Sequence, residues 1–469
     1  MAKRARRTGF APLGRAEKDT AEQGQEDRDD DCHQVVGGGA PGATRARFGA
    51  NPAASFIGAV TAPARSFNPF RTLAVHRNFR LFWVGQTVSL IGTWMQQVST
   101  AWLALELSND PFLVGLVSAA GTLPILLFSM PAGVFADRSR KLGLVRWLQV
   151  GFLVQATLLW WFTWRGHITI GGLIALVLAS GLLEAFEIPP RQSLIVRLVG
   201  KDDLQDAIAL NSGGFNFARI IGPSIAAVVI AQAGIAWVFG INAVSYLAVL
   251  IGLALIRLSP GVDEAGEAGR STWHGIVEAF TYVRNDRLMW ILMRVVALFS
   301  FLGIPVLAML PVMARDHLHR GAGGYGTLMG AFGVGALTGM LLIAGRGGRL
   351  RRGTVLHASS VSLGLCMALF GLSPWYASSI GLLFVCGIAM MGNNALINGL
   401  MQSRVPDHLR ARVMALYVTV YIGMHPIGSA AAGWVARQVG VSPTVAGMGT
   451  LLFIAATWAF RRYPELRAA

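Results

Sequence analysis

The chain has 469 residues, of which 54% are hydrophobic and 14% charged, and it carries a formal net charge of +16. Soluble domains typically carry about 25% charged residues, so this composition argues against an ordinary soluble protein. A chain this apolar cannot cover its surface with polar side chains, and a lipid bilayer is the solvent that suits it.

The first 65 residues differ from the rest of the chain. They begin with a basic run, but no apolar segment follows that would complete a secretory signal. They mix Gly, Ala and Arg with an acidic run at 26–31, and they cannot bury enough apolar surface to fold. We expect residues 1–65 to be a disordered tail, or translated upstream sequence from a misassigned start.

Twelve later segments are long and apolar enough to cross a bilayer as helices, which takes about 20 residues each. They are 81–105, 112–135, 143–164, 168–188, 210–233, 235–256, 290–313, 324–345, 354–373, 376–400, 413–436 and 443–460. Short polar turns, such as the one at 108–111, join neighbouring segments and make them antiparallel. The sequence therefore predicts an all-α membrane protein with twelve transmembrane helices.

The loops between these segments differ sharply in basic charge. Twenty-five Lys and Arg residues lie in the loops and ends on one side, and only Arg165, Arg315, Arg320 and Arg437 lie on the other. Basic loops stay in the cytoplasm, so both termini are expected there, in a plasma membrane such as a bacterial inner membrane. Anionic lipid headgroups account for the net positive charge, and no nucleic-acid partner is expected.

The chain contains an internal repeat. The segments 77–83 (RNFRLFW) and 284–290 (RNDRLMW) agree at five of seven positions at an offset of 207 residues. We expect an N-terminal six-helix half over 66–257, a cytoplasmic linker over 258–271, a C-terminal half over 272–462 and a short tail over 463–469. Two parallel six-helix halves are a recurring architecture of secondary transporters, with the substrate held between them.

Other kinds of chemistry leave no trace in the sequence. It has no phosphate-binding loop of the G-x-x-x-x-G-K-[ST] type, no catalytic triad and no metal-ligand spacing. Its three cysteines, Cys32, Cys366 and Cys386, show no disulfide pattern. We expect neither enzymatic activity nor a cofactor or metal.

The loop after the second segment carries a recognisable motif, Gly133-Val-Phe-Ala-Asp137-Arg138-Ser-Arg-Lys141. It resembles the signature G-x-x-x-D-R-x-x-[RK] of the major facilitator superfamily. The resemblance implies that Asp137 helps to latch the two halves together in one state, and Gly133 is expected at a close helix contact. The alternative is a turn residue among topogenic arginines. The second-half copy has Gly345 where the aspartate would stand, so no equivalent latch is expected there.

The fifth segment contains Gly222 and Pro223, followed by the small residues Ala226 and Ala227. This pattern resembles the antiporter motif of facilitator-type exporters, with alanines in place of most glycines. It favours export over import, and ordinary small-residue packing is the alternative.

A wider resemblance covers residues 70–462. Segments 86–98, 109–111, 216–223 and 405–413 resemble the enterobactin-exporter branch of the same superfamily. That branch implies export of siderophores, macrolides or other amphipathic molecules by proton exchange, and we expect a monomer. The multidrug branch has an arginine within the fourth helix, and none occurs here between Thr169 and Ser180.

Charged and titratable side chains inside the predicted spans are costly and often functional. Glu184 and Glu187 lie three residues apart on one face of span four, and Arg219 lies within span five. We expect Glu184 and Arg219 to meet across neighbouring helices, either as a structural salt bridge or as a proton-coupling site. His425, in span eleven, is a second coupling candidate, because histidine titrates near neutral pH.

Uncharged polar residues in the spans are candidates for a substrate cavity. They are Gln86, Gln96 and Gln97 of span one, Asn393, Asn394 and Asn398 of span ten, and Tyr417 and Tyr421 of span eleven, which share a stripe with His425. The sequence thus predicts a proton-driven exporter of small amphipathic molecules. A facilitator that imports a nutrient, and a membrane sensor or scaffold that transports nothing, remain the alternatives.

Overall fold

The computed structural model describes residues 69–257, 273–346 and 352–468, apart from Lys201 and Pro464. The described residues belong to one compact unit, Ser66–Ala469. The predicted tail (1–65) and linker (258–271) lie outside the described residues.

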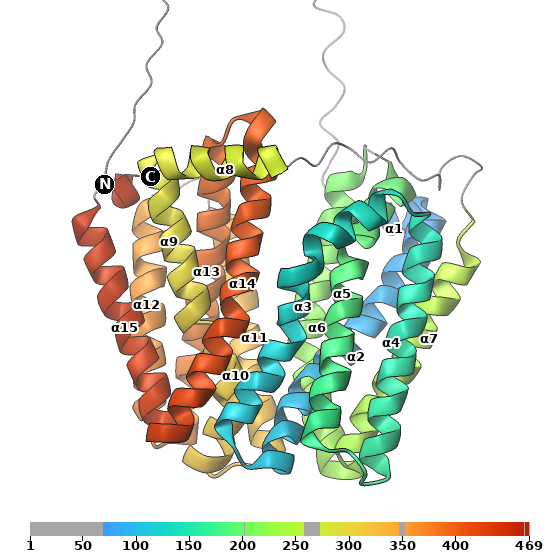
Figure 1. Ribbon diagram of the computed structural model, residues 1–469, viewed down its shortest axis with the longest axis horizontal. Coiled ribbons are helices and arrows are strands. Elements are labelled where there is room, and N and C mark those ends of the chain that lie inside the picture. Colours follow the sequence, from blue (N-terminus) through green and yellow to red (C-terminus); the bar gives the residue numbers. More distant parts are fainter. Residues whose placement is uncertain (1–68, 201, 258–272, 347–351, 464, 469) are drawn as a thin grey trace, which may run out of the picture. The chain divides into compact units, whose positions relative to one another are not determined.

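Regular structure in the described part of the chain is entirely helical (Figure 1). The N-terminal half contains α1 (Pro69–Val75), α2 (Arg77–Ser108), α3 (Pro111–Asp137), α4 (Lys141–Trp164), α5 (Ile170–Val199), α6 (Leu204–Ala233) and α7 (Ile235–Leu255). The C-terminal half contains α8 (Trp273–Asn285), α9 (Arg287–Leu302), α10 (Pro305–Val312), the π-helical turn η2 (Met313–His317), α11 (Ala322–Arg346), α12 (Arg352–Leu372), α13 (Tyr376–Arg404), α14 (Asp407–Val439), α15 (Val441–Arg462) and α16 (Glu465–Ala468).

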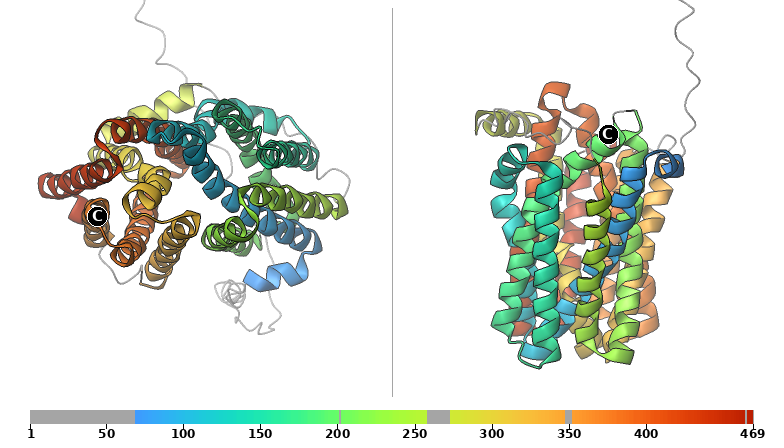
Figure 2. Two further views of the ribbon diagram at one scale, coloured as in Figure 1. Left: turned by 90° about the horizontal axis from the view of Figure 1, so that it is seen from below. Right: turned by 90° about the vertical axis from the view of Figure 1, so that its right-hand side faces the viewer.

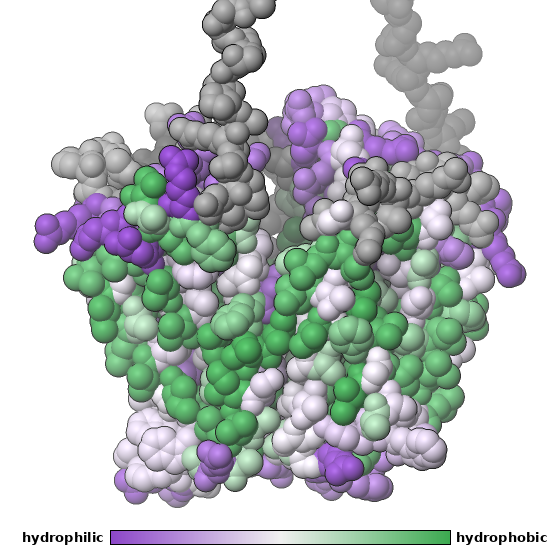
Figure 3. Space-filling model, turned by 180° about the vertical axis from the view of Figure 1, so that it is seen from behind, coloured by the Kyte–Doolittle hydropathy of each residue, from purple (hydrophilic) through white to green (hydrophobic). Residues whose placement is uncertain are grey.

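Eleven helical stretches of the described chain are long and apolar enough to cross a membrane. The twelfth expected span corresponds to α2, which has 32 residues but carries Gln86, Gln96 and Gln97 and is therefore less apolar. It runs through the bundle beside the others (Figure 1). On the face shown in Figure 3, a hydrophobic band crosses the middle of the bundle and hydrophilic residues gather at both ends. The all-α membrane fold is confirmed. Eleven helical stretches are long and apolar enough to span a bilayer, and α2 is consistent with a twelfth span.

The seventh expected span is less regular than the sequence suggested. Instead of one helix over 290–313, the chain forms α9, α10 and η2, with a break at Gly303 and Ile304. Pro305 is the first residue of α10, a position that suits proline because its missing N–H needs no partner there and its φ is already helical. The short helix α8 precedes this span and lies across the end of the bundle (Figure 1), where no regular structure was expected.

The two halves form adjacent bundles when seen along the helices (Figure 2). They meet along two seams, where α3 packs on α14 and α6 packs on α11. Glycines allow these close approaches. A Cβ at Gly115 of α3 would lie 2.4 Å from the carbonyl oxygen of Ser429 in α14, and one at Gly326 of α11 would lie 2.4 Å from Cβ of Ala227 in α6.

Candidate functional site

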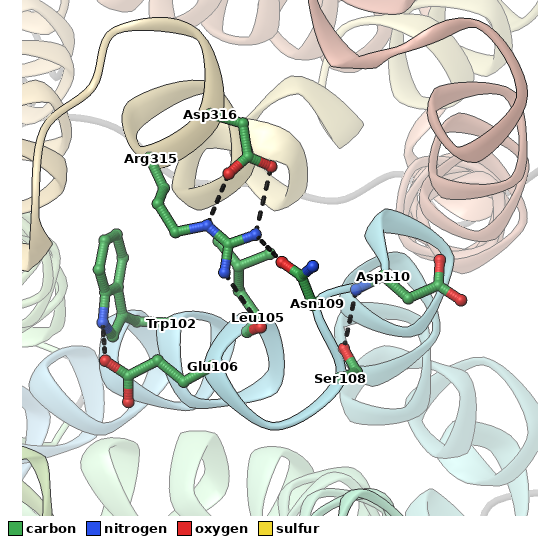
Figure 4. A network of polar contacts seen from close by, with 8 residues as sticks. All are labelled: Trp102, Leu105, Glu106, Ser108, Asn109, Asp110, Arg315 and Asp316. Atoms are coloured by element: carbon green, nitrogen blue, oxygen red, sulfur yellow. Dashed lines mark hydrogen bonds and ion pairs between the residues drawn. The ribbon is translucent and has the colours of Figure 1, made fainter.

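The two ends of the bundle differ in how the halves contact each other. We call the end with the α2–α3 turn the Asn109 end and the opposite one the α8 end. At the Asn109 end, Arg315 of η2 reaches the other half (Figure 4). Its guanidinium donates to the carbonyl oxygen of Leu105 at 3.4 Å and to the side-chain oxygen of Asn109, while Asp316 holds its Nε at 2.6 Å.

Two further contacts join the halves at this end. Arg437 of α14 lies 3.5 Å from the carboxylate of Asp110, which also caps α3 by accepting from the backbone N–H of Phe112. The rings of Trp102 and Tyr325 stack with their centroids 6.0 Å apart. The Asn109 end is therefore held closed.

No such contact between the halves is found among the described residues at the α8 end. A Cβ built at Gly133, Gly213 or Gly345 would meet no atom within 4 Å. The contacts nearest this end lie deeper, where Asn216 approaches the sulfur of Met340 at 3.7 Å and Gly423 faces Leu126. The surface is recessed between the two bundles at this end (Figure 3). The space between the halves therefore opens toward the α8 end.

The signature motif lies at this open end. Asp137 and Arg138 are exposed, and the Asp137 carboxylate has no hydrogen bond or ion pair with any described residue. Lys141 is buried instead, and its Nζ donates to the carbonyl oxygens of Ala136 and Asp137 at 2.7 and 2.8 Å. Lys141 thus caps the C-terminus of α3. The expected close helix contact at Gly133 is absent, because the halves are apart here.

The acidic residues of span four have a different partner from the one expected. Glu187 is buried and forms an ion pair with Arg191 one turn further along α5, at 3.0 Å. Gln149 of α4 donates to the same carboxylate at 3.4 Å. Glu184 is accessible, and its charged neighbours are Glu187 and Arg191 rather than Arg219. The expectation that Glu184 and Arg219 meet was wrong, because α5 supplies its own arginine.

Arg219 faces the C-terminal half instead. The backbone of α6 at Arg219 lies against Gly333 of α11, and the guanidinium is close enough to Tyr421 of α14 to interact electrostatically. Asn394 of α13 lies near the Tyr421 hydroxyl. The structure therefore brings one candidate of the first half together with two of the second.

The predicted tyrosine stripe of α14 is an aromatic surface beside Arg219. Tyr417 and Tyr421 stack with centroids 6.1 Å apart, and Tyr421 also stacks on Phe299 of α9 at 6.3 Å. Asn398 lies near the Tyr417 hydroxyl. His425, one turn further along, is partly buried and has no hydrogen-bond partner among the described residues.

The remaining amide candidates do not gather at the seam. Gln96 is buried inside the N-terminal half, between Gln155 at 3.2 Å and Asn242 at 2.8 Å. Gln86 is also buried, whereas Gln97 is exposed. Asn393 donates to Ser360 of α12 at 2.7 Å and lines a cavity of about 120 Å³ within the C-terminal half.

The small residues of α6 pack against two neighbouring helices. A Cβ at Gly222 would lie 2.7 Å from Cβ of Trp94, so this glycine lets α6 approach α2 within its own half. Ala226 is fully buried, and Pro223 and Ala227 face Gly326 of α11 across the seam. The motif therefore contributes both to packing within the half and to the interface between halves.

A second, apolar cavity of about 90 Å³ lies at the other seam. Residues of α3, α5 and α14 line it, among them Leu126, Ala185, Ile188 and Thr419. Sequence reasoning named none of these, since small and apolar residues occur throughout the spans. Arg191 was also missed, although its place four residues after Glu187 is the spacing of a helical ion pair. Arg315 was counted only as one of four basic residues on the sparse side.

Comparisons with known proteins agree with this architecture. The family model described as transmembrane secretion effector matches residues 64–468. Macrolide efflux protein A of Streptococcus pyogenes is 20% identical over 80% of this chain and 93% of its own. The staphyloferrin A transporter of Staphylococcus aureus is 26% identical over 79% and 92%, and the enterobactin exporter of Citrobacter koseri is 21% identical over 81% and 91%.

Solved structures show the same fold at low sequence identity. A bacterial homologue of the human lysosomal transporter Spinster, inward-facing and unoccupied, matches with a TM-score of 0.66 and 14% identity over 87% of this chain and 99% of its own. A bacterial homologue of the iron transporter ferroportin, also inward-facing, has a TM-score of 0.65 and 13% identity over 84% and 100%. The chain is a multi-pass membrane transporter of the major facilitator superfamily, and it belongs to the transmembrane secretion effector family, among efflux and siderophore-export relatives.

Proposed function

We propose that this transporter exports small amphipathic molecules, siderophore-like or drug-like, by alternating access coupled to proton entry. The observation that carries the proposal is the partly unbonded guanidinium of Arg219 in one half, within electrostatic range of Tyr421 of the other, in a space that opens at a single end. A substrate bound there contacts both halves, so its binding affects their relative movement. The efflux and siderophore proteins among the relatives support export.

The direction of transport is outward if the α8 end faces the cytoplasm. The basic loops predicted to be cytoplasmic belong to this end, which carries Arg138 and Arg140 of the signature motif. The protein then takes up substrate from the cytoplasm in the state described, and both termini lie inside a plasma membrane. Asp137, unpaired while this end is open, is proposed to form its latch when the end closes. We further propose that the protein works as a monomer.

Glu184 is the proposed proton carrier. It lies in a membrane-spanning helix and is accessible, whereas Glu187, three residues further on, is committed to Arg191 and Gln149. An accessible carboxylate in a membrane is able to take up and release a proton as the space opens to either side, while a buried paired one is not. We therefore assign a structural role to Glu187, and the uptake and release of the proton to Glu184.

Transport by the purified protein in liposomes tests the proposal. Erythromycin and enterobactin are supplied outside liposomes whose lumen is acidic, neutral or alkaline. An antiporter concentrates substrate only in the acidic lumen, because protons leave as substrate enters, and collapse of the gradient abolishes the accumulation. Equilibration without concentration at every lumenal pH supports the facilitator alternative. A protein that moves neither compound under any gradient contradicts the proposed function.

A further inference from the structure

Arg219 has part of its guanidinium buried and unbonded in the middle of a membrane-spanning helix. It lies about 22 Å along α6 from Leu204, at 1.5 Å per residue. A guanidinium always carries its charge and offers five N–H donors. Both Nε and Nη2 of Arg219 are shielded from solvent, and neither has a hydrogen-bond partner. Because an unpaired charge in the membrane interior is costly, its presence calls for an acceptor from outside the described protein.

Three other buried or partly buried charges in the spans and their ends have partners within the protein. Lys141 binds the carbonyl oxygens at the end of α3, and Arg146 donates to the carbonyl oxygen of Leu253 at 2.5 Å through Nη2. Glu187 has Arg191 at 3.0 Å. The fold thus provides partners for buried charges where the role is structural, which sets Arg219 apart.

The surroundings of Arg219 describe the missing group. No carboxylate side chain of the described residues forms an ion pair with it, and Tyr421 is the residue that acts on it electrostatically. Tyr421 is partly exposed, and the buried rings of Tyr417 and Phe299 stack on it with centroids 6.1 and 6.3 Å away. A cation next to an aromatic surface suits a ligand with a negative group and an apolar body.

We propose that Arg219 is the subsite for an ionised carboxylate of the transported molecule, whose apolar part lies against Tyr421. This inference rests on the proposed transport function and adds amphipathic acids to its substrate class. The planar guanidinium fork matches the two oxygens of a carboxylate, which a lysine does not. The ligand links α6 of one half to α14 of the other.

Dansylglycine and its methyl ester form a matched pair of probes, because the ester removes the negative charge and keeps the fluorescent apolar ring. Binding to the full-length protein in phosphatidylcholine nanodiscs is followed by dansyl fluorescence. The acid is expected to bind about tenfold or more tightly than the ester. Arg219→Gln is expected to remove this preference, and Arg219→Lys to weaken it. Arg294→Gln, at an exposed arginine that lies over Trp290, is the control and keeps it.

Several results overturn the inference. The wild type binding acid and ester equally well is one such result, and failure of the acid to bind is another. A preference for the acid that persists in Arg219→Gln is the third. Phosphatidylglycerol in the nanodiscs is a further test. If it competes with the acid for the wild type but not for Arg219→Gln, the subsite belongs to a lipid headgroup instead. The ligand-free Tm of Arg219→Gln is expected to equal or exceed that of the wild type, and a fall in Tm reveals a structural partner.

The liposome experiment separates this inference from the proposed function. If erythromycin or enterobactin is still concentrated by a pH gradient while acid and ester bind alike, export stands and the carboxylate subsite falls. If neither compound is transported but the acid preference depends on Arg219, the subsite stands and the proposed function falls.

Discussion

Replacing Arg315 by glutamine tests whether the contacts at the Asn109 end hold the halves together. In the described state, its guanidinium bonds Leu105 and Asn109 of the other half, and Asp316 orients it (Figure 4). Glutamine keeps a polar side chain but removes the charge and the fork that makes these bonds. The variant is therefore expected to favour the state open at the Asn109 end.

The solvent exposure of the Arg315 side chain sets the size of this shift between the two states. Charge-assisted hydrogen bonds contribute about 1.5–3 kcal/mol when buried. The Arg315 side chain is 29% exposed, so solvent reduces the total to about 1–2 kcal/mol. A change of that size alters a two-state population about 5–30-fold. Arg437 and Asp110 remain in place, so the end is loosened rather than released.

The assay measures how fast a buried cysteine near the Asn109 end is alkylated. Val98 of α2 is 2% exposed and belongs to a hydrophobic cluster shared by both halves. Val98→Cys, in a chain whose native cysteines are replaced, is expected to react about 5–30 times faster in the Arg315→Gln background. Arg320→Gln is the matched control, because Arg320 lies at the same end but covers Tyr376 of its own half at 4.8 Å.

An unchanged alkylation rate in Arg315→Gln refutes the reasoning, provided that the variant keeps its Tm. An equal acceleration in Arg320→Gln refutes it too, since that outcome means that any lost arginine loosens this end.

Four other outcomes follow from the structure. Asp137→Asn is expected to reach the membrane normally and to transport several-fold more slowly in liposomes, because it weakens the closed state of the α8 end; an unchanged rate reduces Asp137 to a turn residue. Glu184→Gln is expected to express normally and to exchange substrate downhill but not to concentrate it in an acidic lumen, and uphill transport by this variant removes Glu184 as the coupling group. Glu187→Gln breaks a buried ion pair, at a cost of about 3–5 kcal/mol, so its Tm and yield are expected to fall; a Tm equal to that of the wild type contradicts this. Alkaline phosphatase, which is active only outside the cytoplasm, is expected to be silent when fused after Arg467, and strong activity there contradicts a cytoplasmic C-terminus.

The architecture could be predicted because the bilayer imposes it. Helix length, apolarity and the asymmetry of basic loops each follow from physical constraints that act on single segments. The repeat at 77–83 and 284–290 then identifies the two halves without any knowledge of packing. The structure differs from the predicted spans where a single residue interrupts an apolar segment, as at Pro305, which begins a new helix within the seventh span.

The pairing of side chains could not be predicted in the same way. Glu184 and Arg219 lie on neighbouring spans at comparable depth, but helix rotation decides which faces meet, and hydropathy does not determine rotation. The structure turns Arg219 toward α11 and α14 and leaves Arg191 to neutralise Glu187. The stripe of Tyr417 and Tyr421 was predictable because it depends on spacing within a single helix.

The arrangement of charges on α3 connects the two ends of the transporter. Asp110, at one end of this helix, pairs with Arg437 of α14 while the Asn109 end is closed, and Asp137, at the other end, is unpaired while the α8 end is open. Since α3 and α14 also form one seam, tilting of one helix against the other separates one end as it brings the other together. If Asp137 forms the proposed latch when the α8 end closes, the two ionic contacts exclude each other, stabilise two end states and disfavour the intermediate in which neither is made. The Asp110–Arg437 pair at the closed end is thus the counterpart of the free Asp137 carboxylate at the open one, and the proposed substrate site at Arg219 depends on neither.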